Sequence, residues 1–214
     1  FLLTSKTIMG RGFPLYGINT GHLGFLASGE AQSAVRDMRK ILERDYSTFP
    51  RIPLKGEIVR DGRCVQCVWA LNEVMVVKSF VSRPIALSVH MGNGKLYSIQ
   101  ADGIIAATPT GSTAYALSAG GPIVHPGVRC AVVIPVCPHS LYPRPLVIPD
   151  TEALRIKLES PACGALLSGD GQDNMDLAPG DEVVVTSDTE KKIDVVSLGD
   201  ETYADVLRGK LNWS

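Results

Sequence analysis

The segment from Ala101 to Gly121 limits the possible folds more than any other part of the chain. It begins with the acid Asp102 and continues with Ile104–Ala107, a short apolar run of the kind that forms a buried strand. Pro109 and Gly111 then break the strand pattern and predict a turn. An acid, a buried strand and a hydroxyl-rich turn in immediate succession are typical of the edge of a nucleotide pocket.

The turn leads into a predicted helix of small residues, which begins at Ala114 and is stopped by Gly120-Gly121-Pro122. Ser112 or Thr113 can cap this helix, whose first N–H groups would favour an anionic ligand. The small side chains would let a planar or sugar group approach the backbone closely. The segment alone leaves one alternative open, a hydroxyl-capped helix that only packs closely on a strand.

Two common phosphate-binding fingerprints are absent from the sequence. No Lys follows Gly111 as the Walker pattern requires, and no G-x-G-x-x-G follows a predicted strand. The run from Asp102 to Pro126 instead resembles the DG-x-x-x-x-TPTGSTAY-x-LSAGGP-x-x-HP motif of the NAD kinase family. Further segments resemble that family's GINTGHLGFL, NE, PHSL-x-x-RPLV, DGQ and LR-x-KL-x-W motifs, at residues 17–26, 72–73, 138–147, 170–172 and 207–213.

The resemblance implies an α/β plus β architecture, the two-domain fold of NAD kinases and diacylglycerol kinases. We expect residues 1–28 to be the remainder of a Rossmann-like α/β lobe, of which part is missing. Residues 29–198 would form a β-sandwich-like, NAD-binding domain, and residues 199–214 would return to the first lobe. The family's GGDG motif, whose Asp removes the proton from the accepting hydroxyl, is expected just before Phe1.

Hydrophobic periodicity predicts individual elements independently of the resemblance. Residues 85–91 alternate before the Gly92-Asn93-Gly94 turn and predict a hairpin that leads to Asp102. Further strands are predicted at 131–136, 154–158, 183–186 and 193–196, and one more at 14–19. Helices are predicted at 3–11, from Ser28 onward and at 205–211. In the second of these helices, one face is apolar and carries Ala34, Val35, Met38, Ile41 and Leu42.

The resemblance also assigns the candidate binding residues. Asn72 and Glu73 would hold the adenosine ribose, and Asp102 would bind a ribose of the dinucleotide, in its own or a neighbouring subunit. The family's contacts to adenine and nicotinamide are matched by Thr113, Ala114, Tyr115 and Ser118. Two further binding positions of the family are matched by Arg83 and Gln172. Phe25 offers an apolar wall against which adenine could pack. For Asn72 and Glu73 the alternative is a strand end that meets solvent, and for Phe25 it is a place in the core. We interpret His139 as structural, since no carboxylate stands nearby in the sequence to orient it as a base.

Composition and charge restrict the function classes further. The chain has 214 residues, with 21 basic and 22 acidic side chains and a net charge of -1, so it lacks the field of a nucleic-acid-binding protein. No apolar run approaches the ~20 residues of a membrane helix. Five cysteines, an odd number at uneven spacing, indicate reduced thiols and a cytoplasmic protein. Cys64 and Cys67 form a C-x-x-C, which we interpret as structural, because a regular strand would point them to opposite faces.

The resemblance implies a NAD kinase, which phosphorylates the 2'-hydroxyl of the adenosine ribose of NAD, and composition and charge are compatible with it. The phosphate donor would be ATP or polyphosphate with a divalent metal, Mg²⁺ being expected. We also expect a homodimer or homotetramer, with no nucleic-acid or membrane partner. Two alternatives remain, a lipid kinase of the diacylglycerol or sphingosine type and a non-catalytic dinucleotide-binding protein.

Overall fold

The computed structural model describes residues 1–20, 25–79, 83–140, 143–159, 164–199 and 202–211. The turn at 21–24 in the GINTGHLGFL motif, Leu141, Cys163 and Trp213 lie outside these ranges. The chain divides into two compact units, one formed by residues 1–51 with 190–214 and the other by residues 52–189. The predicted functional division at residues 28 and 198 stays a prediction.

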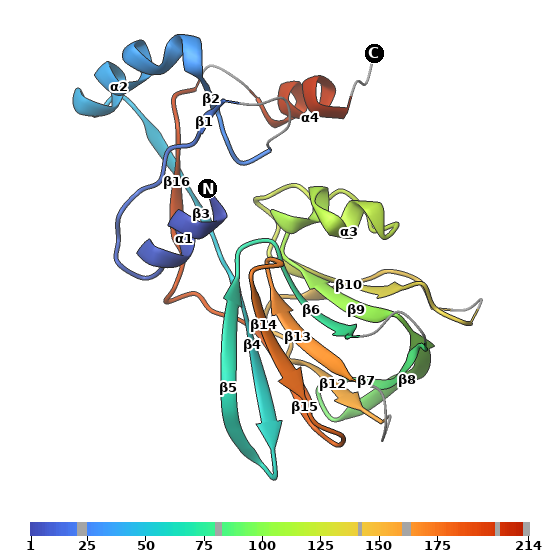
Figure 1. The fold of residues 1–214 in the computed structure, drawn as a ribbon. Helices are drawn as coiled ribbons and strands as arrows, with labels where there is room; N and C mark the ends of the chain where they lie inside the picture. Colours follow the sequence, from blue (N-terminus) through green and yellow to red (C-terminus); the bar gives the residue numbers. More distant parts are fainter. Residues whose placement is uncertain (21–24, 80–82, 141–142, 160–163, 200–201, 212–214) are drawn as a thin grey trace. The chain divides into compact units, whose positions relative to one another are not determined.

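The first unit contains helices and short strand pairs (Figure 1). Its helices are α1 (Leu2–Ile8), the 3-10 turn η1 (Ala31–Ser33), α2 (Ala34–Leu42) and α4 (Tyr203–Leu211). Its strands are β1 (Ile18–Asn19), parallel to β2 (Gly29–Glu30), and β3 (Ser47–Arg51), antiparallel to β16 (Ile193–Ser197).

Two of the predicted elements in this unit are shorter than the sequence indicated. The strand expected at 14–19 is reduced to Ile18–Asn19 and an isolated bridge between Leu15 and Val195. The helix expected from Ser28 begins only at Ala34, because Gly29–Glu30 pairs as a strand. The predicted boundaries of both elements are wrong because backbone pairing with other segments, and not local propensity, determines where each element begins and ends.

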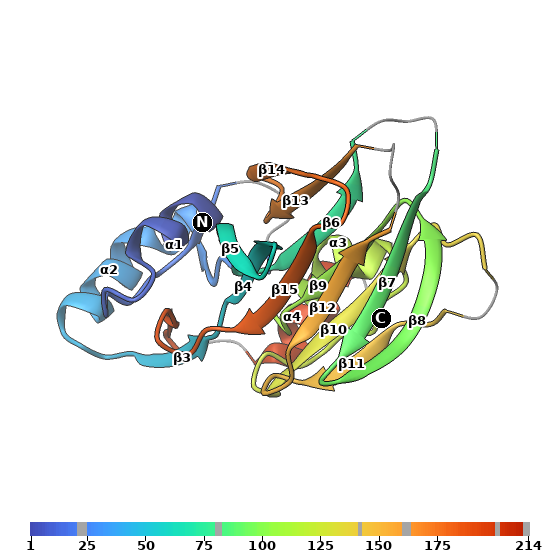
Figure 2. The ribbon, with the colours of Figure 1, turned by 90° about the horizontal axis from the view of Figure 1, so that it is seen from below.

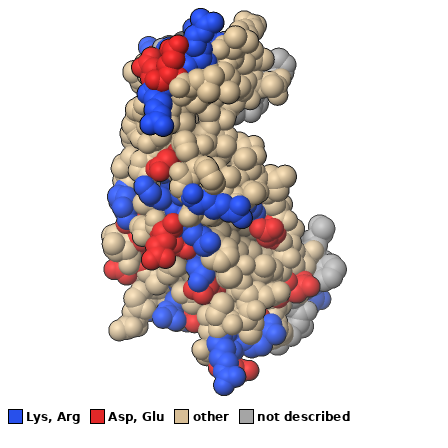
Figure 3. Space-filling model, turned by 90° about the vertical axis from the view of Figure 1, so that its left-hand side faces the viewer, with Lys and Arg blue, Asp and Glu red and all other residues tan. Residues whose placement is uncertain are grey.

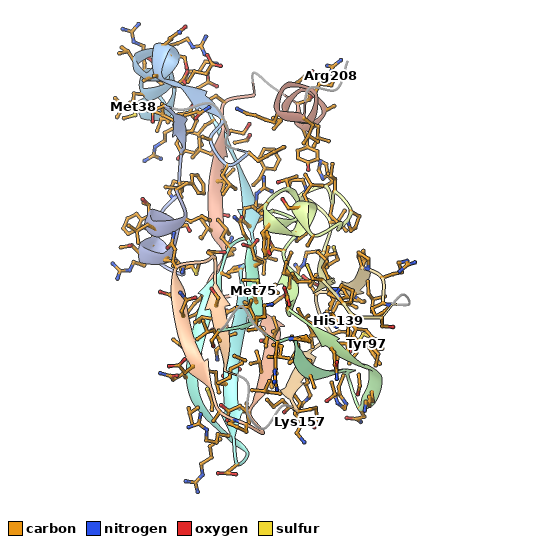
Figure 4. All side chains as sticks on the ribbon, turned by 45° about the vertical axis from the view of Figure 1, so that its right-hand side comes forward. Met38, Met75, Tyr97, His139, Lys157 and Arg208 are labelled. Carbon is orange, nitrogen blue, oxygen red and sulfur yellow. The ribbon has the colours of Figure 1, made fainter. Side chains whose placement is uncertain are left out.

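The periodicity of α2 predicts the helix correctly but its buried face wrongly. Val35 and Leu42 are 80% and 78% exposed, and Met38 extends away from the helix in Figure 4. The buried residue is instead Asp37, whose Oδ2 accepts hydrogen bonds from the Tyr16 hydroxyl (2.7 Å) and the Ser33 hydroxyl (2.5 Å). These hydrogen bonds compensate the desolvation of the carboxylate and hold its pKa below the usual value, although burial opposes them.

The second unit is a sandwich of two six-stranded antiparallel sheets (Figure 2). The first sheet has the order β5-β4-β15-β12-β7-β8, with β5 (Arg63–Ala70), β4 (Leu54–Arg60), β15 (Glu182–Ser187), β12 (Leu154–Leu158), β7 (Ile85–Met91) and β8 (Gly94–Ala101). The second has the order β11-β10-β9-β6-β13-β14, with β11 (Leu146–Pro149), β10 (Cys130–Val136), β9 (Gly103–Ala107), β6 (Glu73–Lys78), β13 (Ala165–Gly169) and β14 (Asp173–Leu177). Buried side chains from both sheets form one core between them.

Several strand predictions in this unit are confirmed. The β7–β8 hairpin leads directly to Asp102, and β12 alternates buried and exposed residues as its sequence indicated. Strand β9 is buried along its whole length because it packs on both faces. Ile104 and Ala106 face the core between the sheets, whereas Ile105 and Ala107 belong to a second cluster that includes Ala116 of helix α3 (Tyr115–Ser118).

A β-bulge changes the placement of the C-x-x-C pair. In the pairing of β4 with β5, Cys67 lies opposite Glu57 and Cys64 opposite Val59, with a register shift at Ile58/Val59. Glu57 and Val59 are two residues apart and therefore share a face, so the two cysteines share that face as well. The prediction that they point to opposite faces is wrong, since it assumed a regular strand. Cys64 is exposed and, like Cys67, a free thiol.

On the face shown in Figure 3, basic side chains lie interspersed with acidic ones. Across the described ranges, none of the helices combines the length and apolar character needed to cross a membrane.

Candidate functional site

The bend between β5 and β6 carries the Asn-Glu pair that the sequence singled out. Strand β5 belongs to the first sheet and β6 to the second, so the chain passes from one sheet to the other at Leu71–Asn72. Asn72 and Glu73 are each only 9% exposed. The two residues lie between the end of β5 and the start of β6, at a corner of the sandwich that is largely buried, and their binding role stays a prediction.

The carboxylate of Asp170 binds every backbone N–H of this bend. Oδ2 accepts from the N–H of Leu71 (2.9 Å), and Oδ1 accepts from the N–H of Asn72 (2.8 Å) and of Glu73 (3.2 Å). The N–H of Asp170 in turn donates to the carbonyl of Glu73 (3.0 Å). These contacts join residues 97 to 99 positions apart in the sequence, at the point where the pairing of β6 with β13 ends.

The turn after β9 holds the carbonyl side of the same bend. The Thr108 hydroxyl donates to the carbonyl of Leu71 (2.6 Å), and the Thr108 N–H donates to the carbonyl of Asn72 (2.8 Å). Thr108 Oγ1 also accepts from the N–H of Gly111 (3.0 Å). A Cβ on Gly111 would lie 2.1 Å from the Asn72 carbonyl oxygen, so this close approach requires glycine.

The segment after this turn is less helical than the sequence indicated. A 3-10 turn, η2 (Gly111–Thr113), precedes helix α3, which has only four residues. Ser112 does not cap the helix, because its buried hydroxyl donates to the carbonyl of Pro109 (2.6 Å) and accepts from the N–H of Val124 (3.0 Å). Thr113 bonds to the carbonyl of Thr110 instead of capping (3.3 Å). The predicted cap is therefore wrong, and Ser112 fixes the chain that returns after α3.

The candidate ligand-binding side chains of this segment are accessible. Tyr115 is 44% exposed, Ser118 is exposed, and Thr113 and Ala114 are half-buried. Ala116, between them, is fully buried against the sheet. The short helix therefore turns one side to the sheet and leaves the predicted contact residues open to a ligand.

Glu73 is the electrostatically unusual group at this end of the sandwich. Its Oε2 is buried and has no hydrogen-bond partner. Burial, and after it the charge of Asp170, raises the pKa of Glu73 to about 7. A buried carboxylate without a partner is costly, so an incoming hydroxyl donor would satisfy it.

The predicted site residues fall into separate groups. One end of the second sheet carries Asn72, Glu73 and the 113–118 segment. Gln172 lies at the same end, since it follows the Asp170 turn and donates its N–H to the carbonyl of Gly169 (3.0 Å). Asp102 lies at the other end of β9, six residues and roughly 20 Å from Thr108 along the strand. Phe25 belongs to the first unit.

Asp102 has a defined environment at its end of β9. Its carboxylate contacts Lys78 Nζ at 2.6 Å, and its N–H donates to the carbonyl of Val136 (2.9 Å). Arg83, which is exposed, comes two residues before Ile85, the strand partner of Ala101. The N–H of His139 donates to the carbonyl of Gln100 (2.8 Å), and Figure 4 shows His139 on the side of the sandwich where Tyr97 lies. His139 is thus near Asp102 and far from Glu73.

Sequence reasoning missed the two residues that build the bend. The sequence placed Asp170 only in the DGQ motif match, and the structure shows it in a turn with a left-handed φ of 53°. An Asp next to Gly at such a turn was the available signal, but its reach to residues 71–73 depends on the tertiary fold. Thr108 was interpreted only as part of a hydroxyl-rich turn.

Comparison with known proteins agrees with this geometry. Residues 71–197, which begin at the Asn-Glu bend, match the model of the ATP-NAD kinase C-terminal domain. A NAD kinase of Symbiobacterium thermophilum is 41% identical over 201 residues, which cover 94% of this chain and 71% of that protein. A NAD kinase of Moorella thermoacetica is 37% identical over 210 residues, covering 98% of this chain and 67% of that protein.

Solved structures show the same relationship. The crystal structure of yeast NADH kinase complexed with NADH superposes with a TM-score of 0.85 at 30% identity, covering 92% of this chain but only 58% of that one. A NAD kinase from Archaeoglobus fulgidus in complex with ATP superposes with a TM-score of 0.70 at 26% identity, covering 93% and 71%. Fold and site thus define a phosphotransferase of the two-domain, nucleotide-binding class. Within that class, the chain belongs to the NAD kinase family.

Proposed function

We propose that the protein phosphorylates the 2'-hydroxyl of the adenosine ribose of NAD and so produces NADP. The observation that carries the proposal is the bend at 71–73. It presents a buried, unpartnered Glu73 oxygen next to Asn72, beside a hydroxyl-rich segment that matches the family motif. A carboxylate oxygen and an amide suit the paired hydroxyls of a ribose, because together they offer acceptors and donors.

The remaining roles follow from the same placement. Asn72 and Glu73 would hold the ribose hydroxyls, and the accessible side of the 113–118 segment would contact the bases. Gln172 lies at the same end of the second sheet and is exposed, so its side chain is accessible to a ligand. Phe25 belongs to the first unit, and its role as an apolar wall for adenine stays a prediction.

Asp102 requires a different arrangement. Because it lies roughly 20 Å along β9 from Thr108, we propose that it serves a dinucleotide bound by a second copy of the chain. Arg83 lies near the same end of the sheet and would act with it. The proposed enzyme is accordingly a homodimer or homotetramer.

The reaction itself needs positioning and neutralisation of charge. The ribose 2'-oxygen forms a bond to the terminal phosphorus of the donor, and the bond from that phosphorus to the leaving oxygen breaks. As the new bond forms, the hydroxyl proton passes to a carboxylate, for which the family resemblance implies the Asp of the GGDG motif. Among the described residues, no three His, Cys, Asp or Glu side chains gather as a metal site. The expected Mg²⁺ would enter with the donor phosphates, whose charge it neutralises.

A direct assay tests the proposal. The full-length protein is incubated with NAD, Mg²⁺ and either ATP or inorganic polyphosphate, and NADP is measured with an NADP-specific dehydrogenase. NADP formation with at least one donor supports the proposal, and the two arms identify the donor. Phosphorylation of diacylglycerol or sphingosine without NADP formation would favour a lipid kinase. Tight NAD binding without turnover with either donor would favour a non-catalytic binding protein.

The cellular location is part of the proposal. All four cysteines in the described part of the chain are free thiols, two of them exposed. Free exposed thiols persist in a reducing compartment. We therefore place the enzyme in the cytoplasm.

A further inference from the structure

We infer that Asp170 is a positioning residue: its carboxylate fixes the 71–73 bend so that Asn72 and Glu73 meet the ribose, while Asp170 itself does not contact the ligand. The inference rests on the proposed function, because it deepens the role of the same site. Asp170 and Glu73 are each only 9% exposed.

The hydrogen-bond geometry carries the inference. The two Asp170 oxygens accept three consecutive backbone N–H groups, at 2.9, 2.8 and 3.2 Å, and all three bonds are buried. Charge-assisted bonds of this kind are stronger than neutral ones, and each leaves a buried donor unsatisfied if it is lost. The bend therefore depends on this single side chain for all of its N–H contacts.

The position of Asp170 in the sheet explains why a side chain is needed there. Strand β6 pairs with β13 as far as Val74 and Gly169, and the ladder ends at that pair. The next residue, Asp170, adopts a left-handed φ of 53°, and its own N–H still donates to Glu73. Its carboxylate then takes the place of backbone acceptors for the residues that turn toward the other sheet.

The contacts also separate Asp170 from a ligand-binding role. Oδ1 accepts the N–H groups of Asn72 and Glu73 and Oδ2 accepts that of Leu71, so both oxygens face the bend. Glu73, in contrast, has a buried oxygen without a partner. Glu73 Oε2 thus offers a free acceptor to a ligand, and the charge of Asp170, held against the bend, acts on the Glu73 carboxyl.

This arrangement predicts two consequences of removing the Asp170 charge. The bend should open more often, because an amide in place of the carboxylate offers one acceptor oxygen instead of two. The ionisation of Glu73 should also become easier, since the negative charge of Asp170 contributes, after burial, to its raised pKa. A residue that only supports the fold would not change the titration of Glu73 in this direction.

The test compares Asp170→Asn with the control Asp176→Asn in the full-length protein. Asp176 is an exposed acid on the neighbouring strand β14, so its substitution removes the same charge without touching the bend. Hydrogen exchange of the amides at 71–73 and the carboxyl titration of Glu73 are measured by NMR without ligand. NAD affinity is measured by calorimetry.

For Asp170→Asn we expect amide exchange at 71–73 to rise roughly tenfold or more, the Glu73 titration to move to lower pH, and the Kd for NAD to rise roughly tenfold or more. Asp176→Asn should change none of these. Unchanged exchange and titration would overturn the inference, whatever happens to NAD affinity. If the wild-type protein neither binds nor phosphorylates NAD, the proposed function fails, whereas exchange and titration, measured without ligand, still decide whether Asp170 holds the bend.

If Asp170→Asn is poorly folded, the Thr108→Val variant provides the second measurement. It leaves the Asp170 charge in place and removes the Thr108 hydroxyl, which donates to the Leu71 carbonyl and accepts from the Gly111 N–H. Exchange at 71–73 should rise in this variant while Glu73 still titrates near its wild-type midpoint. A Glu73 titration that moves to the same low pH in Thr108→Val would show that bend opening, and not the Asp170 charge, controls Glu73, and would overturn that part of the inference.

Discussion

At the scale of single residues, Glu73 gives the protein a defined pH dependence. Folding raises the pKa of this carboxyl from 4.5 to about 7, so the folded chain holds the proton more tightly than the unfolded chain. The contribution to the free energy of unfolding is complete below about pH 4.5 and is lost as the pH rises through about 7. Its size is on the order of 3 kcal/mol.

Urea unfolding at several pH values between 5 and 8 measures this effect. The difference in unfolding free energy between the wild type and Glu73→Gln should change across this range in favour of Gln as the pH rises, because the amide cannot ionise. Other titrating groups are common to both proteins and cancel in the difference. A difference that is constant with pH would show that Glu73 is not the group responsible.

Asp102 yields a prediction of a different kind, because its carboxylate is accessible and paired. Asp102→Ala removes the contact with Lys78 and, by the proposed function, the hydrogen bonds to a ribose. The loss of a charged hydrogen-bond partner should raise the Kd for NAD by about 10- to 150-fold, equivalent to about 1.5–3 kcal/mol. Overall stability should fall by less than about 1 kcal/mol, as for other partly exposed ion pairs.

Glu182→Gln is the matched control for Asp102→Ala. Glu182 pairs with Arg155 at 3.2 Å on the first sheet, and its side chain is 27% exposed against 31% for Asp102. The control should leave the Kd for NAD unchanged. An unchanged Kd in Asp102→Ala with a collapsed turnover rate would instead make Asp102 a participant in the chemistry.

At the scale of elements, hydrogen bonds from Thr108 join the turn after β9 to the bend before β6. Gly111 permits their close approach, since a Cβ there would lie 2.1 Å from the Asn72 carbonyl oxygen. Gly111→Ala should therefore force the turn from the bend and destabilise the protein by at least about 2 kcal/mol. It should also weaken NAD binding, because the bend moves with the turn.

Thermal unfolding and calorimetry of Gly111→Ala check this, with Gly209→Ala as the comparison. Gly209 lies in helix α4 with no other atoms within 4 Å of the added Cβ. That substitution should leave NAD binding intact and stabilise the helix by up to about 1 kcal/mol. Equal stability in the two variants would contradict the close contact at Gly111.

The elements also show what could be predicted from the sequence. Strands β7, β8, β9 and β12 were predictable because their residues alternate, or are continuously apolar between turn signals. Asn72 and Glu73 could be named as candidates because the NE motif is a short run of neighbouring residues that can be matched in the sequence. The hydrogen bonds of Asp170 were not predictable, because they join residues 97 to 99 positions apart. The exposed apolar side of α2 was missed because periodicity shows that a face is apolar but not what packs on it.

At the scale of the whole molecule, the two compact units are joined by two neighbouring chain crossings. The chain enters the sandwich at β4 and leaves it after β15. These two strands pair with each other, and Leu54 lies opposite Ser187. The N–H of Asp188 donates to the carbonyl of Pro53 (3.0 Å) just outside that pair. Both sheets and the core between them are therefore complete within residues 52–189.

This connectivity predicts that residues 52–189 fold without the other unit. Cutting at both crossings breaks no strand pair of either six-stranded sheet and leaves the two new ends side by side. Circular dichroism and urea unfolding of the isolated segment should show a β-rich protein with a single cooperative transition, and amide exchange at 71–73 should match that of the full chain. A shorter segment that begins after β4 lacks the strand that joins β5 to the rest of the first sheet, and it serves as the non-folding control. A gradual, non-cooperative transition of residues 52–189 would show that the sandwich depends on the first unit for its stability.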